Sequence, residues 1–379
     1  MARRLSRMLR WALALVLTLV VAVLVANRGY YLGGSASGQY CTTCHQIQAP
    51  HDRAAASAHR TLDCKECHGA ALTTNLELHK TNLRHLWYQV SGRIPDRVRL
   101  KDAQVDFVAS NCRRCHASQF ARWTAGGHSV AFDHIFLSRA HNSKTRLMDD
   151  CLRCHGMFVD GNVTSIVQPI DNVGPWTMVR DHDRGRPTIP CLACHSMHAR
   201  GTPLKAGPNY LEPRTIAYGR VVETTSLAFY DRRERRHVPA ADLPMPAMTQ
   251  DDRPVVMSPD RRQRVCYQCH APEATRRVHT GDDRTATGVH EGIGCLGCHD
   301  PHALDAKVSC ANCHPASSNC GLDVTTMDTT FKTAGSAHDI HSVACADCHP
   351  KGVPPPKAGT PRAARVAAVV AVPSRKVTR

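Results

Sequence analysis

The stretch Cys41-Thr42-Thr43-Cys44-His45 is the first of nine copies of one pattern, CxxCH, in a chain of 379 residues. These copies use 18 of the 19 cysteines, and Cys320 alone stands outside them. The spacing between copies is irregular, so the chain is not a solenoid built on one repeat. The other copies are Cys64–His68, Cys112–His116, Cys151–His155, Cys191–His195, Cys266–His270, Cys295–His299, Cys310–His314 and Cys345–His349.

Each copy has the residues that attach one haem covalently. Two thiols one helical turn apart form thioethers with the haem vinyl groups, and the following histidine binds the iron as proximal ligand. Zinc ribbons and disulfide scaffolds also use many cysteines, but neither requires a histidine after every second cysteine. The predicted attachment residues are Cys41, Cys44, Cys64, Cys67, Cys112, Cys115, Cys151, Cys154, Cys191, Cys194, Cys266, Cys269, Cys295, Cys298, Cys310, Cys313, Cys345 and Cys348. The predicted proximal ligands are His45, His68, His116, His155, His195, His270, His299, His314 and His349.

Each iron also needs a sixth ligand, or leaves that position open for a substrate. Of the 24 histidines, nine belong to the motifs and fifteen do not, so the chain has enough for all-histidine ligation. The predicted sixth ligands are His59, His79, His128, His141, His198, His290, His302, His338 and His341. His134 is a further candidate, whereas His182 and His237 lie in charged surroundings and are predicted to be surface residues.

The composition fits a core made of haem. Aromatic residues are 5% of the chain, and leucine, isoleucine and phenylalanine are scarce for a protein of this length. The formal net charge of +16 would suit an anionic partner such as nucleic acid. Haem propionates would offset this charge, and the guanidinium fork of arginine is suited to pair with them. We therefore expect no nucleic-acid partner.

The N-terminus combines a basic flank with an apolar run. Arg3, Arg4, Arg7 and Arg10 precede the run, which extends from Trp11 to Ala26. Its length lies between a signal-peptide core and the roughly 20 residues of a full membrane span, and no clear cleavage site follows closely. We favour a retained single anchor over a cleaved signal. The haem domains are then expected on the periplasmic, extracytoplasmic side of the inner membrane.

The motifs also divide the chain into regions, five lying before residue 200 and four after residue 262. The predicted fold is mostly α-helical with much irregular loop, cored by haem and preceded by a transmembrane helix. The predicted regions are an anchor at 1–26, a pentahaem domain at 27–200, a haem-free proline-rich insert or linker at 201–262, a tetrahaem domain at 263–350 and a disordered basic tail at 351–379.

The clearest helix is predicted after the second motif. Leu76, His79, Leu83, Leu86 and Val90 recur at steps of three and four residues, which places them on one helical face. Thr74 and Glu77 form a capping box at the helix start, and Gly92, two residues after Val90, suits the helix end.

Several N-terminal segments carry a family resemblance. They are the apolar anchor with the first motif soon after it, Ser57-Ala58-His59, His79-Lys80, His85-Leu86-Trp87 and Ser91-Gly92-Arg93-Ile94-Pro95. Through them the first 116 residues, and more loosely the first 155, resemble the NapC/NirT/NrfH family of membrane-anchored quinol-oxidising cytochromes. The resemblance implies a first haem close to the membrane that accepts electrons from menaquinol or ubiquinol, with Lys80 at the quinol pocket. Ile47 stands where some relatives have methionine, and those relatives carry fewer haems. The segment Cys295–His302 is similar to doubled-CxxCH multihaem modules.

The sequence favours an electron carrier over an enzyme. Such a carrier takes electrons from the quinol pool or a membrane oxidoreductase and passes them to a periplasmic or outer-surface redox partner. Its first haem would then have quinol dehydrogenase activity. The alternative is a multihaem reductase of nitrite, hydroxylamine or a sulfur oxyanion, which needs one haem with an open position. A third hypothesis, a secreted haem-filament subunit that forms oligomers, requires cleavage of the anchor.

Nine complete motifs predict nine covalent haems. The intact mass of the mature protein should therefore exceed the polypeptide mass by nine haem masses. A shortfall that persists in fully matured protein would mean that one motif carries no haem.

Overall fold

The computed structural model describes residues 2–33, 41–43, 45–69, 76–93, 99–198, 227–250, 252–270, 285–288, 290–303, 341–343 and 351–352. Six motifs, those that begin at Cys64 through Cys295, lie wholly inside these ranges. Several predicted site residues lie outside them. These are Cys44, Cys310, Cys313, His314, Cys320, His338, Cys345, Cys348 and His349, together with the side chains of His45 and His79.

Helices and irregular loops make up most of the described chain, as the sequence predicts. The α-helices are α1 (Ala2–Gly33), α2 (His45–Ala55), α3 (Cys64–His68), α4 (Leu76–Val90), α5 (Asp102–Cys112), α6 (Ala117–Ala125), α7 (Phe132–Phe136), α8 (Arg139–Asn142) and α10 (Gln263–Cys266). Single 3-10 turns are η1 (Cys41–Thr43), η2 (Gly127–Ser129), η3 (Asp149–Arg153), η4 (Val163–Ser165), η5 (Asp181–Asp183), η6 (Cys191–Ala193), η8 (Ala240–Asp242) and η9 (Cys295–Gly297).

The described strands are short and form only two-stranded sheets. The antiparallel pairs are β1 (Val167–Gln168) with β2 (Thr177–Met178), β3 (Ala228–Asp231) with β4 (Arg236–Pro239), and β5 (Thr249–Gln250) with β6 (Arg253–Pro254). The pair β7 (Thr287–Gly288) and β8 (Ser342–Val343) is parallel. No described sheet is large enough to form a core by itself.

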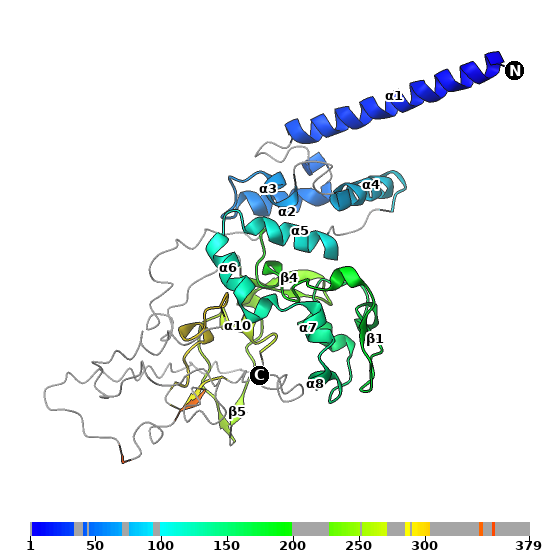
Figure 1. Ribbon diagram of the computed structural model, residues 1–379. Coiled ribbons are helices and arrows are strands. Elements are labelled where there is room, and N and C mark those ends of the chain that lie inside the picture. Colours follow the sequence, from blue (N-terminus) through cyan, green and yellow to red (C-terminus); the bar gives the residue numbers. More distant parts are fainter. Residues whose placement is uncertain are drawn as a thin grey trace, which may run out of the picture.

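The elements follow one another away from α1. Figure 1 shows α1 projecting from one end of the molecule, with α2, α3 and α4 in the tier next to it. The tier that contains α5 comes next, and β5 lies toward the opposite end. Chain order and distance from α1 therefore run broadly in parallel.

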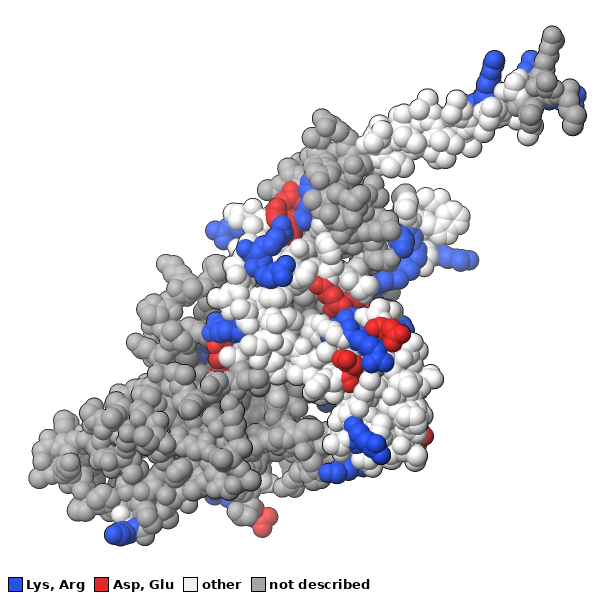
Figure 2. Space-filling view, viewed as in Figure 1, with Lys and Arg blue, Asp and Glu red and all other residues white. Residues whose placement is uncertain are grey.

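Helix α1 contains the predicted apolar run and extends it. The segment Ser6–Ala26 has a mean hydropathy of 2.5 and none of it is buried against the rest of the protein. Arg7 and Arg10 lie at its start, and no charged residue follows from Trp11 to Ala26. Figure 2 shows the basic side chains toward the N-terminal tip of α1. By length and composition α1 is able to cross a membrane, and both an anchor and a signal sequence have these properties.

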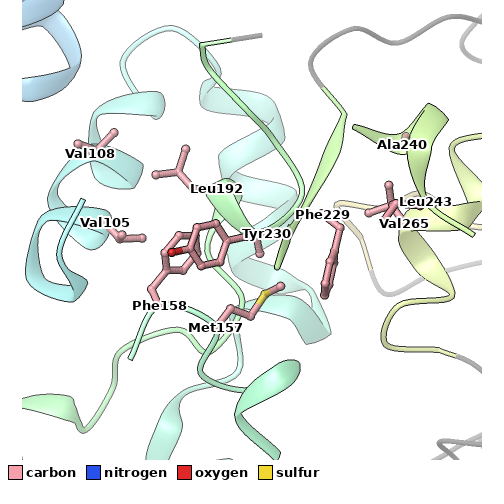
Figure 3. Packing of buried hydrophobic residues seen from close by; sticks show 11 residues of the cluster. Val105, Val108, Met157, Phe158, Leu192, Phe229, Tyr230, Ala240, Leu243 and Val265 are labelled. Atoms are coloured by element: carbon pink, nitrogen blue, oxygen red, sulfur yellow. The ribbon is translucent and has the colours of Figure 1, made fainter. Parts of the chain in front are cut away.

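One hydrophobic cluster joins parts of the chain that are distant in sequence. The cluster includes Val105 and Val108 of α5, Phe229 and Tyr230 of β3, and Val265 of α10 (Figure 3). The rings of Phe158 and Tyr230 stack with centroids 4.0 Å apart. The β3–β4 hairpin, which lies within the range predicted to be a haem-free insert, therefore packs against segments on both sides of it in sequence.

A second hydrophobic cluster surrounds the fourth motif. Phe136, Leu152 and Ile166 are completely buried there, together with Phe132 and Val167. The β1–β2 ribbon covers one part of this cluster through Val167 and Met178, which face each other in register. The segment from α7 to β2 consequently has a core of its own.

His237 is less exposed than the sequence predicts. It lies on β4, where the hairpin register pairs it with Tyr230, and it is half-buried. Its Nε2 atom lies 2.7 Å from the carbonyl oxygen of Leu192. The prediction of a surface histidine was wrong because a charged local sequence says nothing about the segment that packs across it. His182, predicted on the same grounds, is 69% exposed.

A half-buried arginine connects α5 to the segment before the fifth motif. Arg186 donates hydrogen bonds to Asp102, Asp106 and Asp183, each with a shortest distance of 2.6 Å. Asp183 is 1% exposed, and the guanidinium also lies over the ring of Phe132. Burial raises the pKa of Asp106 although Arg186 opposes this. Arg186 is therefore the cation shared by all three carboxylates, and Arg180 adds a second contact to Asp183 at 2.7 Å.

Replacing this cation should destabilise the fold. Arg186→Met removes the cation shared by three carboxylates and leaves Arg180 as the remaining partner of Asp183 and Asp102, so the free energy of unfolding should fall by about 1.5–3 kcal/mol. Guanidinium titration followed by circular dichroism measures the change. Arg184→Met is the matched control because Arg184 pairs with the exposed Asp181, and its effect should stay within about 0.5 kcal/mol. Equal effects of the two substitutions would contradict the role assigned to Arg186.

Candidate haem sites

The described motifs share one backbone conformation. The histidine N–H donates to the carbonyl oxygen of the first cysteine at 2.8–3.0 Å in the motifs that begin at Cys112, Cys151, Cys191, Cys266 and Cys295. The remaining complete motif is helix α3, where Asp63 accepts from the N–H of Lys65 and caps the turn. One helical turn brings the two thiols and the imidazole to the same site, as thioether attachment and iron ligation require.

Five motif histidines face a second histidine at nearly constant distance. The ring centroids lie 6.0–6.2 Å apart in the pairs His68–His198, His116–His59, His195–His302, His270–His128 and His299–His341. The interplanar angle varies from 5° to 88° over the same pairs. Direct ring stacking would restrict this angle together with the distance, whereas ligation of one central atom restricts mainly the distance.

The spacing fits an iron between the two rings. Two metal–nitrogen bonds of about 2.0 Å and two ring radii of about 1.1 Å separate the centroids by about 6.2 Å. All five partner histidines are among the nine predicted sixth ligands. The side chains present therefore fit haem iron with two axial histidines. Within the described residues there is no cluster of three or more ligating side chains of the kind that a zinc ribbon needs.

The one complete motif outside these five pairs, Cys151–His155, also has a histidine nearby. Burial lowers the pKa of His155 to about 4, and the next largest cause is the neighbouring His141. The Nδ1 atom of His141 lies 3.0 Å from Oδ1 of Asn142, a buried residue whose amide donates to the carbonyl of Phe136. This contact orients the His141 ring, as partners of metal ligands generally do.

Burial favours the neutral form of three facing imidazoles, those of His68, His195 and His198. It lowers the pKa of both His195 and His198 to about 4, and the charges of His302 and His68, respectively, act in the same direction. Burial also lowers the pKa of His68. A neutral imidazole is the form that binds a metal, so these sites are prepared for ligation at pH 7.

Local contacts hold two of the partner histidines in place. The backbone N–H of His302 donates to Asp300 at 2.9 Å, and Arg122 of α6 pairs with the same carboxylate. The Nδ1 atom of His128 lies 3.1 Å from the carbonyl oxygen of Pro301. Sequence reasoning identified His302 but missed Asp300, although an aspartate before a proline is a recognisable turn signal.

Cysteines of different motifs lie side by side. In four pairs the two thiols are close enough to shift each other's pKa: Cys41 with Cys64, Cys112 with Cys191, Cys154 with Cys269, and Cys266 with Cys295. Electrostatic interactions also connect Cys67 with Cys112, and Cys194 with Cys266. The cysteines that would attach different haems are therefore neighbours in space, even where their motifs are not consecutive in the sequence.

Other predicted site residues have less defined surroundings. Lys80 is exposed on α4, His134 is exposed on α7, and His290 is half-buried shortly before the seventh motif. The assignment of Lys80 to a quinol pocket stays a prediction.

Motifs, facing histidines and comparisons with known families agree on the class of the protein. It is a multihaem c-type cytochrome, which binds haem covalently and transfers electrons. Residues 36–203 match the family described as outer membrane cytochrome MtrC/MtrF-like, domains II/IV, and residues 230–300 match the family of cytochrome c554 and c-prime. No curated protein and no solved structure matches the chain. The likeness to the NapC/NirT/NrfH family stays a prediction.

Proposed function

We propose that the chain is a nine-haem electron conduit whose irons each have two histidine ligands. The observation that carries this proposal is the set of five histidine pairs with centroids 6.0–6.2 Å apart. His141 is assigned to the site of His155 on the contact described above. This leaves three motif histidines, His45, His314 and His349, and three predicted sixth ligands, His79, His290 and His338.

The ligand pairs support an electron carrier rather than a reductase. Bound haem supplies an iron that is oxidised and reduced by one electron. Two of the chain's own histidines would hold the iron at each of the five paired sites, so a nitrite or hydroxylamine molecule would have to displace one of them. All nine motifs also end in histidine, and the lysine-ended motif of ammonia-forming nitrite reductases is absent.

The neighbouring cysteines support a definite order of sites. Contacts between motifs give the order first, second, third, fifth, sixth and seventh, and the fourth site lies beside the sixth. The first site is close in sequence to α1, and the later ones lie progressively further from it (Figure 1). The sixth site, at Cys266–His270, is thus a junction with the fourth, fifth and seventh.

The proposed direction of transfer is outward from the inner membrane. Helix α1 would remain as an anchor with its N-terminus in the cytoplasm, and the quinol pool or a membrane oxidoreductase would donate at the first site. A periplasmic or outer-surface redox protein would accept electrons from the distant end. The basic flank and the apolar segment Ser6–Ala26 support this orientation.

A second candidate is an extracellular haem protein released from α1. The match of residues 36–203 to a family named for outer membrane cytochromes favours it. N-terminal sequencing of the mature protein separates the two candidates. A retained Met1 or Ala2 supports the anchor, and a new N-terminus between α1 and Cys41 supports release.

The ligand assignment predicts a spectroscopic change at one haem. The ferric protein should show mainly low-spin signals in electron paramagnetic resonance, because two imidazoles give six-coordinate iron. His302→Ala should convert one haem to high spin while the intact mass still reports every haem. His182→Ala is the matched control because His182 is exposed. An unchanged spectrum in the His302 variant would exclude this residue as the ligand opposite His195.

Quinol should reduce the purified protein through the first site. The full chain in detergent is mixed with a reduced menaquinol analogue, and haem reduction is followed by absorbance. A variant with His45 replaced, and separately the Lys80→Met variant, should each lose quinol-driven reduction. Both should remain reducible by dithionite. Lys144→Met, which removes an exposed lysine at the end of α8, should behave as the unmodified protein. If no quinol reduces the unmodified protein, a partner protein must deliver the electrons.

A further inference from the structure

Helix α4 has an exposed apolar stripe. Leu83, Trp87 and Val90 are 66%, 66% and 77% exposed, and they follow one another at helical spacing on one face. Lys80 is also exposed and continues the same row by one turn toward the N-terminus. We call these four residues the α4 stripe. Large apolar side chains grouped in this way mark a binding surface more often than isolated ones do.

The opposite face of α4 is fixed against its neighbours. Thr81 is 7% exposed and accepts a hydrogen bond from Gln104 of α5 at 3.5 Å. Gln89 donates to Gln46 of α2 at 3.0 Å. These contacts prevent α4 from rotating its apolar stripe into the protein.

Backbone hydrogen bonds define the C-terminal end of α4. The N–H of Arg93 donates to the carbonyl of Tyr88 at 2.9 Å, and Gly92 has a φ of +69°, as in a Schellman motif. The stripe therefore belongs to an intact helix that ends just beyond Val90. It is a stable surface that a partner can recognise.

The position of α4 limits what the stripe can reach. Helix α1 ends at Gly33, and residues 34–40 connect it to η1. That connection spans at most about 28 Å when fully extended. α4 is bonded to the first turn of α2, which follows η1 directly, and it lies in the tier next to α1 (Figure 1). The stripe is thus held near the surface of any membrane that α1 crosses.

The charges around the stripe suit anionic lipid. Lys80, Arg84 and Arg93 lie on or beside α4, and the sequence has no acidic residue between Glu77 and Asp96. Basic residues near an anionic bilayer are attracted to its headgroups, while tryptophan and leucine enter the boundary between headgroups and acyl chains.

We propose that the α4 stripe is a second membrane contact, which lies in the interface of an anionic phospholipid bilayer. This inference rests on the proposed function in one respect, the retention of α1 as an anchor. Leu83, Trp87 and Val90 enter the interface, and Lys80, Arg84 and Arg93 contact phosphate groups. Two contacts fix the orientation of the haem-binding body, which a single anchor helix does not.

The experiment separates the two contacts. A protease site is placed between Gly33 and Cys41 of the full chain, and the haem-loaded protein is reconstituted into vesicles of phosphatidylglycerol and phosphatidylethanolamine. Before cleavage the protein should float with the vesicles at high salt. After cleavage at low salt, the haem absorbance should still float with them. Leu83→Ser/Trp87→Ser/Val90→Ser should lower this vesicle partitioning by about tenfold or more.

The controls make each outcome decisive. Met148→Ser/Val173→Ser/Val256→Ser removes three exposed apolar side chains elsewhere and should retain the cleaved body on vesicles. Release of the unmodified body to the same extent as the stripe variant overturns the proposal. Retention by native membranes but not by pure lipid also overturns it, because the stripe then binds a protein. A chain that does not float before cleavage contradicts the anchored function and this inference together. Intact mass must show equal haem content in all variants.

Discussion

The structure depends on pairs of histidines that face each other across a space about one iron wide. With few aromatic side chains, the chain builds only two modest hydrophobic clusters among its described residues. The facing histidines come from segments distant in sequence, as with His68 and His198, whose centroids lie 6.2 Å apart. Iron ligation between such segments would provide the long-range contacts that a large apolar core provides in an ordinary domain of this size.

The pairs also connect the motifs before residue 200 with those after residue 262, and each part supplies a facing histidine to the other. His302 from the C-terminal part faces His195, and His128 from the N-terminal part faces His270. The hydrophobic cluster that contains Val108, Tyr230 and Val265 runs across the same junction. Opening one part would therefore break ligation in the other, so we expect strong coupling between their stabilities.

The sequence predicted the residues that attach and bind each haem better than it predicted which histidines face each other. The CxxCH pattern specifies attachment cysteines and proximal histidines because all three residues lie within one helical turn. The helix at 76–90 was confirmed, since its periodicity is local. Ligand pairing is set by tertiary contacts across more than a hundred residues in the case of His68 and His198, and no local pattern encodes it. The same limitation explains the error at His237, whose burial depends on the backbone of Leu192.

The order of the pairs has a consequence for assembly over time. If the chain is exported from its N-terminus, His68 emerges long before His198, and His195 before His302. His299 likewise precedes its partner His341. The proposed ligation at these sites would be completed only after later segments have been exported. A nascent chain would thus pass through a period in which several irons hold weaker, replaceable ligands and are open to small molecules from which the mature protein shields them.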